Sequence, residues 1–284
     1  MATHPGHPLA PISAALNAWQ VWDQNWRARD ARLDLGEILG VGSANTVFSL
    51  DREPDLVLRV RHNTVSLSLN SPTQEITLWR SAAALGLAPD VVWSGPNKDV
   101  VITKRLTFHG IDADAHSLLL KNVHESGIRA PRFSLERAAT RYAEAIREKD
   151  LGHLAVDIDI PAIREDLQQL DNEPSCFCHN DLTPTNIGKI EGRYLAIDWE
   201  YASLGSRHFD IAVASQHMEE NVRNTFATRT AGTFFDLRQW RVACRVVPGM
   251  VRGQSSSSHP AQDLGVFVSG PHIATLAVHR QRAL

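Results

Sequence analysis

One segment in the second half of the chain constrains the fold more than any other. Three short apolar runs bounded by polar residues predict strands, and a turn at Glu191-Gly192 joins the last two. The runs cover residues 175–178, 187–190 and 194–197. A strand, a loop and a hairpin in this order would bring Asp198, which follows the hairpin, back beside Asn186 at the end of the loop.

The polar residues of this segment have the spacing of a catalytic site. His179, Asp181 and Asn186 follow the pattern H-x-D-x-x-x-x-N, which matches the kinase catalytic loop at these three positions. Asp181 can accept a proton from a hydroxyl group, while Asn186 and Asp198 offer the oxygen ligands that Mg²⁺ prefers. Each residue alone is more often a turn former, a cap or a core histidine. The ordered set favours phosphoryl transfer. Asn180 replaces the Arg of regulated protein kinases, which favours a constitutively assembled site.

Two stretches carry a family resemblance. Residues 178–181 (CHND) and 197–202 (IDWEYA) resemble the bacterial choline kinases and their ethanolamine and thiamine kinase relatives, within the aminoglycoside-phosphotransferase-like group. The likeness runs from about Leu35 to about Glu220 and includes Asp210, for which it implies a structural role as anchor of the catalytic loop. The implied fold is α+β and two-lobed, like that of protein kinases, with a small antiparallel β-rich N-lobe and a larger, mainly helical C-lobe.

The resemblance also implies an activity. This is phosphorylation of the hydroxyl of a small molecule, choline or ethanolamine, with ATP and Mg²⁺ as cofactors. The alternatives are a thiamine, amino-sugar or aminoglycoside kinase, and a kinase-fold protein that binds without turnover. The corresponding domain boundaries are an N-terminal helical extension at 1–30, an N-lobe at 31–105, a C-lobe at 106–252 and an atypical tail at 253–284. The sequence pattern predicts helices around residues 13–26 and 208–219, and a further helix that Ser134 caps and that runs to about Lys149.

The N-lobe pattern predicts where the nucleotide phosphates bind. Residues 35–48 suggest two strands around a turn of small residues, although such a turn is usually only a hairpin. Its backbone N–H groups and hydroxyls could cover phosphates. The candidate residues are Gly40, Gly42, Ser43 and Asn45.

A strand cation and a helix carboxylate are predicted to follow. Arg59 lies in an apolar run at 56–60 and stands where kinases carry the strand Lys that contacts the phosphates. Arg61 shares its face of the strand and is the rival candidate. Glu75, in a predicted helix at 73–85, is expected to pair with the cation, although a solvated first-turn Glu is the alternative.

The remaining site predictions rest on position. The strand at 100–106 would lead into the hinge, where the backbone of Thr103 and Arg105 would contact the adenine edge. Glu200 would face the metal or a cationic acceptor, or else stabilise its loop. Trp240, together with Phe234 and Phe235, could contact a quaternary ammonium through cation–π interactions, although core packing is the commoner role.

The composition excludes several other classes. The chain has 284 residues, 43% of them hydrophobic, and a net charge of −3 without a basic run. It can bury two lobes, and nothing favours binding to nucleic acid or to a membrane surface. No apolar run could span a bilayer, no signal segment opens the chain, and the cysteine count is odd, so we expect a reducing cytoplasm. Cys176 and Cys178 lack a second ligand pair, which disfavours structural zinc. The oligomeric state stays open.

Overall fold

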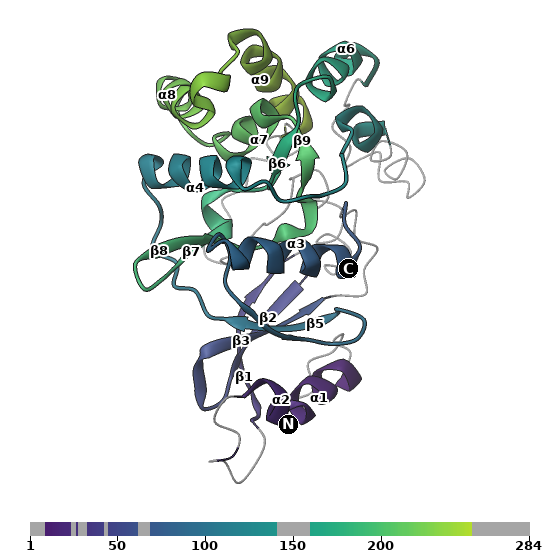
Figure 1. The fold of residues 1–284 in the computed structure, drawn as a ribbon, viewed down its shortest axis with the longest axis vertical. Helices are drawn as coiled ribbons and strands as arrows, with labels where there is room; N and C mark the ends of the chain where they lie inside the picture. Colours follow the sequence, from purple (N-terminus) through teal and green to yellow (C-terminus); the bar gives the residue numbers. More distant parts are fainter. Residues whose placement is uncertain are drawn as a thin grey trace, which may run out of the picture.

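The protein has a β-rich lobe and a larger helical lobe (Figure 1). The computed structural model describes residues 9–23, 27, 33–42, 45–61, 69–140 and 160–251. The predicted α+β class and the two-lobed arrangement are confirmed. Ser43 and the predicted tail at 253–284 lie outside the described residues. Of the helices in the described ranges, none combines the length and the apolar character that crossing a membrane requires.

The N-lobe is built on an antiparallel sheet whose strand order is β1-β2-β3-β5-β4. The strands are β1 (Leu35–Val41), β2 (Asn45–Leu50), β3 (Glu53–Arg61), β4 (Val91–Ser94) and β5 (Val100–Lys104). β3 is the central strand, and its last six residues are buried, because both of its edges are paired and both of its faces are covered. The strands predicted at 35–48, 56–60 and 100–106 are therefore confirmed.

Two N-terminal helices cover one face of this sheet. They are α1 (Leu9–Asn17) and α2 (Trp19–Trp22), and the structure corrects the single helix predicted around residues 13–26. Ile12 and Trp22 share one apolar core with Phe48 and Leu58 of the sheet. The predicted extension at 1–30 thus contributes to the N-lobe core, as far as its residues are described. Trp26 lies outside the described part of the chain.

Helix α3 (Pro72–Ala84) lies between the sheet and the helical lobe (Figure 1). Its ends agree with the sequence signals. Ser71 accepts the Gln74 N–H as the N-cap, and Gly86 has φ = 69°, a left-handed conformation that glycine adopts without strain and that stops the helix. Trp79 is buried on this helix and donates its indole N–H to the Pro89 carbonyl at 2.8 Å.

The helices of the C-lobe pack around a common core. Those described from end to end are α4 (Ala113–Glu125), α6 (Ile160–Asp171), α7 (Arg207–Ala214), α8 (Glu220–Ala231) and α9 (Leu237–Val251), and a further helix begins after Ser134. The helix predicted at 208–219 ends earlier, at Ala214, because the chain turns before α8 begins. Ser134 caps a helix as predicted, with its Oγ 3.2 Å from the Arg137 N–H. The predicted continuation of this helix beyond residue 140 lies outside the described ranges.

The C-lobe also contains two small antiparallel sheets. β7 (Ile187–Ile190) and β8 (Arg193–Ala196) form the predicted hairpin. β6 (Cys176–Cys178) pairs with β9 (Ser203–Gly205), a strand that the sequence pattern did not indicate. The 3-10 turn η2 (Pro184–Asn186) leads into β7, and η3 (Trp199–Tyr201) lies between β8 and β9, whereas η4 (Gly232–Phe234) lies farther along the chain, between α8 and α9. The short sheets hold η2 and η3, and these turns carry the predicted site.

The buried face of β3 supplies a test of the N-lobe core. Leu58→Ala removes a fully buried side chain and should lower the free energy of unfolding by about 2–5 kcal/mol. Leu118→Ala on α4, whose side chain is 59% exposed, is the matched control and should change it by less than about 0.5 kcal/mol. Urea denaturation measures both variants, and equal losses would contradict the assigned core.

Candidate active site

A buried carboxylate anchors the loop that carries the candidate catalytic residue. Asp210 on α7 accepts the His179 N–H at 2.9 Å and the Asn180 N–H at 2.7 Å. His124 Nε2 at the end of α4 lies 3.0 Å from the same carboxylate. Burial opposes the charge of Asp210, but the His124 hydrogen bond and the neighbouring histidines lower the pKa of Asp210 overall. The geometry agrees with the structural role that the resemblance implied.

Asn180 has a structural use at the position where regulated protein kinases carry Arg. Its backbone is left-handed, with φ = 63°, a conformation that Asn tolerates better than most residues. Its side-chain amide donates to the Tyr201 carbonyl at 2.9 Å and to Ser203 Oγ at 2.8 Å. The catalytic loop is thereby tied to η3 and β9.

Asp181 and Asn186 lie in direct contact. The Asn186 amide donates to the Asp181 carboxylate at 2.7 Å and to the Asp181 carbonyl at 2.9 Å. Both side chains are almost fully buried. The Ile197 N–H donates to the Asn186 carbonyl at 2.9 Å, so the strand leading to Asp198 runs beside the loop. The hairpin brings the two segments together as the sequence predicted.

Asp198 adopts a left-handed conformation, with φ = 67° and ψ = 67°, just before η3. A non-glycine residue in this region carries strain that neighbouring structure must hold. Trp199 supplies part of that support, because its ring is fully buried, stacks on Phe177 at 5.9 Å and contacts the His179 ring at 4.6 Å. The turn therefore fixes where the Asp198 carboxylate lies.

Glu75 pairs with a strand cation as predicted, and it pairs with two arginines instead of one. Arg59 Nη1 lies 2.6 Å from Glu75 Oε1, and Arg61 Nη2 hydrogen-bonds to Glu75 Oε2. Arg59 also stacks on Trp79, 5.0 Å from the ring centre. Burial opposes the charge of Arg59, but Glu75 and Asp198 outweigh it and raise the pKa of Arg59. The structure keeps both arginines as candidates for phosphate contacts.

Glu200 belongs to the same charged cluster. Its side chain is buried, and its Oε2 lies 3.8 Å from Arg61 Nη2. Burial raises the pKa of Glu200 to about 8, with further contributions from Asp198 and Glu75, while the arginines oppose the shift. A contact between Glu200 and the metal or an acceptor stays a prediction.

Asn70, which sequence reasoning missed, joins the N-lobe to the turn after Asp198. Its side-chain amide donates to the Ala202 carbonyl at 2.8 Å and to the Trp199 carbonyl at 3.3 Å, and its backbone N–H donates to the Glu200 carbonyl at 3.1 Å. Asn70 lies just before α3, in a polar stretch that resembles an ordinary helix start, so only its contacts across more than 120 residues reveal its role.

The phosphate-binding role of the first turn stays a prediction. Gly42 N–H donates to the Asn45 carbonyl at 2.8 Å and closes the turn between β1 and β2. A side chain at Gly40 would meet open space, so this glycine leaves room beside the strand. Asn45 is buried, and its Oδ1 accepts no hydrogen bond from the described residues.

The connection between the lobes is held by backbone contacts. Thr103 Oγ1 donates to the Asp90 carbonyl at 2.9 Å, and Arg105 N–H donates to the Asp55 carbonyl at 2.8 Å. Leu106 packs closely on Gly188. A β-carbon added to Gly188 would lie 2.6 Å from the β-carbon of Leu106. The Thr103 hydroxyl and the Arg105 backbone N–H therefore both form hydrogen bonds within the N-lobe. An adenine contact by this segment stays a prediction from position.

The aromatic residues proposed for the acceptor occupy different environments. Trp240 is buried in the C-lobe core and donates its indole N–H to Asn224 Oδ1 at 2.9 Å. Trp240 thus has the core-packing role that was the alternative to an acceptor contact. Phe234 is exposed and lies 4.5 Å beneath the Arg207 guanidinium, and Phe235 packs near His208. These contacts are made with other protein groups.

The Asn70 contacts supply a second test. Asn70→Ala removes two side-chain hydrogen bonds and should lower the free energy of unfolding by about 1–3 kcal/mol. Amide hydrogen exchange at residues 199–202 should accelerate, because the turn loses its N-lobe support. Asn221→Ala, at an exposed position on α8, should leave both measurements unchanged. Unchanged exchange in Asn70→Ala would contradict the assigned role.

Burial of His179 predicts a pH dependence of stability. Burial lowers the pKa of His179 to about 4 in the native state. In the unfolded state this histidine has a pKa of about 6.5, so between pH 6.5 and pH 4 the unfolded state binds a proton that the native state does not bind. Stability should therefore fall as the pH drops from 6.5 towards 4. Between pH 7 and pH 5 the wild type should lose about 2 kcal/mol more than His179→Gln, as urea unfolding would show. The exposed His109→Gln should match the wild type, and equal losses in all three proteins would exclude this contribution.

Parts of the chain are similar in sequence to known proteins. The chain is 28% identical over 109 residues to a "Protein LicA homolog" of Mycoplasma capricolum, and 31% identical over 102 residues to "Ethanolamine kinase 2" of Mus musculus. These alignments cover 38% and 32% of the chain, but only 45% and 26% of the relatives' own lengths.

Solved structures share the fold. The choline kinase LicA of Streptococcus pneumoniae matches with a TM-score of 0.60 at 14% identity, over 82% of this chain and 85% of that one. Aminoglycoside phosphotransferases match as well, one of them with ADP bound, at a TM-score of 0.56 and 15% identity. The model of the phosphotransferase enzyme family covers residues 35–243, from β1 to α9. The chain belongs to the phosphotransferase enzyme family.

Proposed function

We propose that the protein transfers the terminal phosphoryl group of ATP to the hydroxyl of a small molecule, with choline or ethanolamine as the acceptor. One observation carries this proposal. The Asn186 amide holds the Asp181 carboxylate, and the Ile197 N–H bonds the Asn186 carbonyl, so the residue before Asp198 lies beside this pair. Two carboxylates and an amide in this order are the groups that phosphoryl transfer would require here.

The donor atoms suit Mg²⁺. Asn186 and Asp198 would hold it, because carboxylate and amide oxygens are its usual protein ligands. Bound there, Mg²⁺ would neutralise charge on the phosphate oxygens. The burial of Asn186 and the fixed turn at Asp198 support this assignment, because rigid ligands cost little entropy on binding.

Asp181 would act on the acceptor. Its carboxylate would receive the hydroxyl proton and orient the oxygen for attack. The Asn186 amide binds one of its oxygens, which restricts the rotamer of the carboxylate. Most of the rate enhancement would come from this positioning and from charge stabilisation.

The N-lobe cations would bind the phosphates. Arg59 and Arg61 each pair with one oxygen of Glu75, and a guanidinium can bind phosphate oxygens through paired N–H groups. Glu75 would hold both side chains in position for these contacts. The turn containing Gly40 and Gly42 would cover the phosphates from above.

The choice of acceptor rests on sequence relatives. The two relatives described above carry the names LicA homolog and ethanolamine kinase, and their similarity supports a small amino alcohol. The fold is common to choline kinases and aminoglycoside phosphotransferases, so it does not separate these acceptors. Thiamine, amino sugars and aminoglycosides are therefore the competing acceptors in the test below, and binding without turnover is a further outcome.

An acceptor panel tests the proposal. The purified protein is incubated with ATP, Mg²⁺ and each of choline, ethanolamine, thiamine, an amino sugar and an aminoglycoside, and mass spectrometry detects the phosphorylated product. We expect phosphocholine or phosphoethanolamine. Asp181→Asn should lower kcat by at least about 100-fold, because general-base catalysis contributes that much.

Variants separate chemistry from binding. Asp181→Asn should retain nucleotide affinity, whereas Asp198→Asn should lose the Mg²⁺-dependent part of it. Asp51→Asn, at an exposed position after β2, should behave like the wild type. Full turnover in Asp181→Asn would refute the assigned base, and Mg²⁺-dependent nucleotide binding without any product would favour the binding protein.

A further inference from the structure

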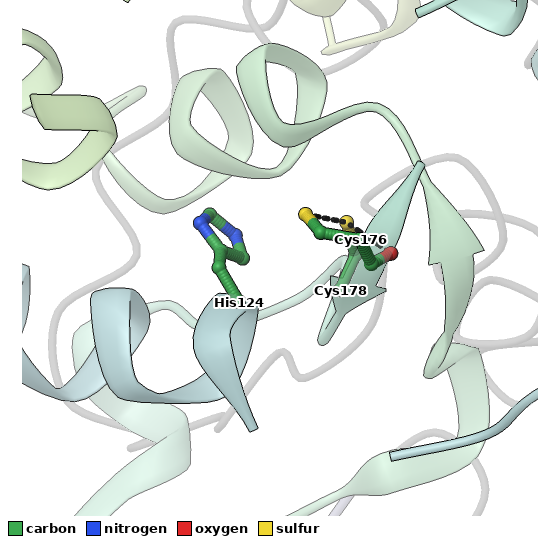
Figure 2. A group of neighbouring side chains, drawn as sticks. All are labelled: His124, Cys176 and Cys178. Atoms are coloured by element: carbon green, nitrogen blue, oxygen red, sulfur yellow. Dashed lines mark hydrogen bonds between the residues drawn. The ribbon is translucent and has the colours of Figure 1, made fainter. Parts of the chain in front are cut away.

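A second group of metal-binding side chains lies behind the catalytic loop. His124 extends from the last turn of α4, and Cys176 and Cys178 extend from β6 (Figure 2). One donor atom from each residue lies within 4.8 Å of the other two. Along the sequence alone, the two cysteines lack a second ligand pair, although His179 directly follows Cys178. The fold adds a third ligand, His124, from more than 50 positions away.

The two thiols already have the separation that a shared ion requires. Residues two apart on a strand lie on the same face, and Cys176 Sγ is 3.7 Å from Cys178 Sγ. Zinc–sulfur bonds of about 2.3 Å at tetrahedral angles place two sulfurs about 3.8 Å apart. Figure 2 shows the His124 ring across from the thiols, so a modest inward movement completes three ligands.

A disulfide fits this geometry less well. Two positions along an extended strand separate the Cα atoms by about 6.6 Å, close to the upper limit of about 6.8 Å for a disulfide. Closing the S–S bond to about 2.05 Å would bend β6 away from β9, with which Cys176 and Cys178 are both paired. A bound ion leaves the strand pairing intact.

The surroundings favour a soft cation. Cys178 and His124 are buried, while Cys176 is partly exposed and offers a route for the ion and a place for a fourth, water ligand. Two thiolates and one imidazole are ligands that Zn²⁺ and similar d¹⁰ ions prefer over the Mg²⁺ bound by oxygen donors. The site is thus chemically distinct from Asn186 and Asp198.

We propose that His124, Cys176 and Cys178 form a binding site for one thiophilic metal ion of the Zn²⁺ class. Binding replaces the two thiol protons, which are released to solvent, with two metal–sulfur bonds. The site lies next to the anchor of the catalytic loop, because His124 also bonds Asp210 and because Cys178 directly precedes His179. Occupancy of the site is therefore connected to the loop through these contacts.

Cadmium titration of the reduced, metal-free full chain tests the proposal. Cd²⁺ bound to thiolates gives an ultraviolet charge-transfer band, and we expect this band to saturate at one ion per chain. Zn²⁺ should displace Cd²⁺ from the same site. Cys176→Ser and Cys178→Ser should each weaken binding by more than about 100-fold, because loss of an outer-sphere partner alone costs 10- to 100-fold.

Cys244 provides the matched control. It is a third, partly buried cysteine on α9, outside the group, and Cys244→Ser should bind Cd²⁺ like the wild type. Should the β6 variants fail to fold, Co²⁺ absorption of the wild type still reports whether sulfur and nitrogen ligands bind in a tetrahedral set. No charge-transfer band in the wild type, or binding that survives Cys176→Ser or disappears in Cys244→Ser, would overturn the proposal. These readouts do not depend on phosphoryl transfer.

Discussion

The buried carboxylate of Asp210 is the constraint on which the candidate site depends. Its two oxygens bind consecutive backbone N–H groups at His179 and Asn180, and His124 bonds the same group. A carboxylate that accepts several hydrogen bonds keeps its charge despite burial, and removing it would leave those donors unsatisfied. Helices α4 and α7 and strand β6 therefore meet at one charged group, and Asp181 projects from the loop that this group holds.

Apolar and polar contacts both join the two lobes. One core cluster joins the sheet to α1 and α2, while a second contains α3 and Val101 of β5 together with the C-lobe helices. Among the polar contacts between the lobes, Arg61 contacts both Glu75 and Glu200, and Asn70 binds the turn around Trp199. Polar contacts depend on geometry more steeply than apolar ones, so this junction sets the alignment of the lobes.

The sequence predicted what depends on local pattern. The hairpin at β7 and β8, helix α3 and the meeting of Asn186 with Asp198 follow from turn residues, helical periodicity and strand spacing. Contacts between distant segments were not predictable in this way. Strand β9 has only three residues, Asn70 looks like an ordinary helix start, and the sharing of Glu75 between two arginines depends on how α3 packs on β3. The exact ends of helices such as α7 depend on tertiary packing that propensity does not record.

The covering of the sheet by α1 and α2 has a practical consequence. Ile12, Leu16 and Trp22 fill the same core as Phe48 and Leu58, although the family model begins only at residue 35. A shortened chain that starts at residue 31 would uncover this apolar face of the sheet. Large exposed apolar patches promote self-association, so trimming the protein to its family boundaries would yield an aggregating product instead of a minimal enzyme.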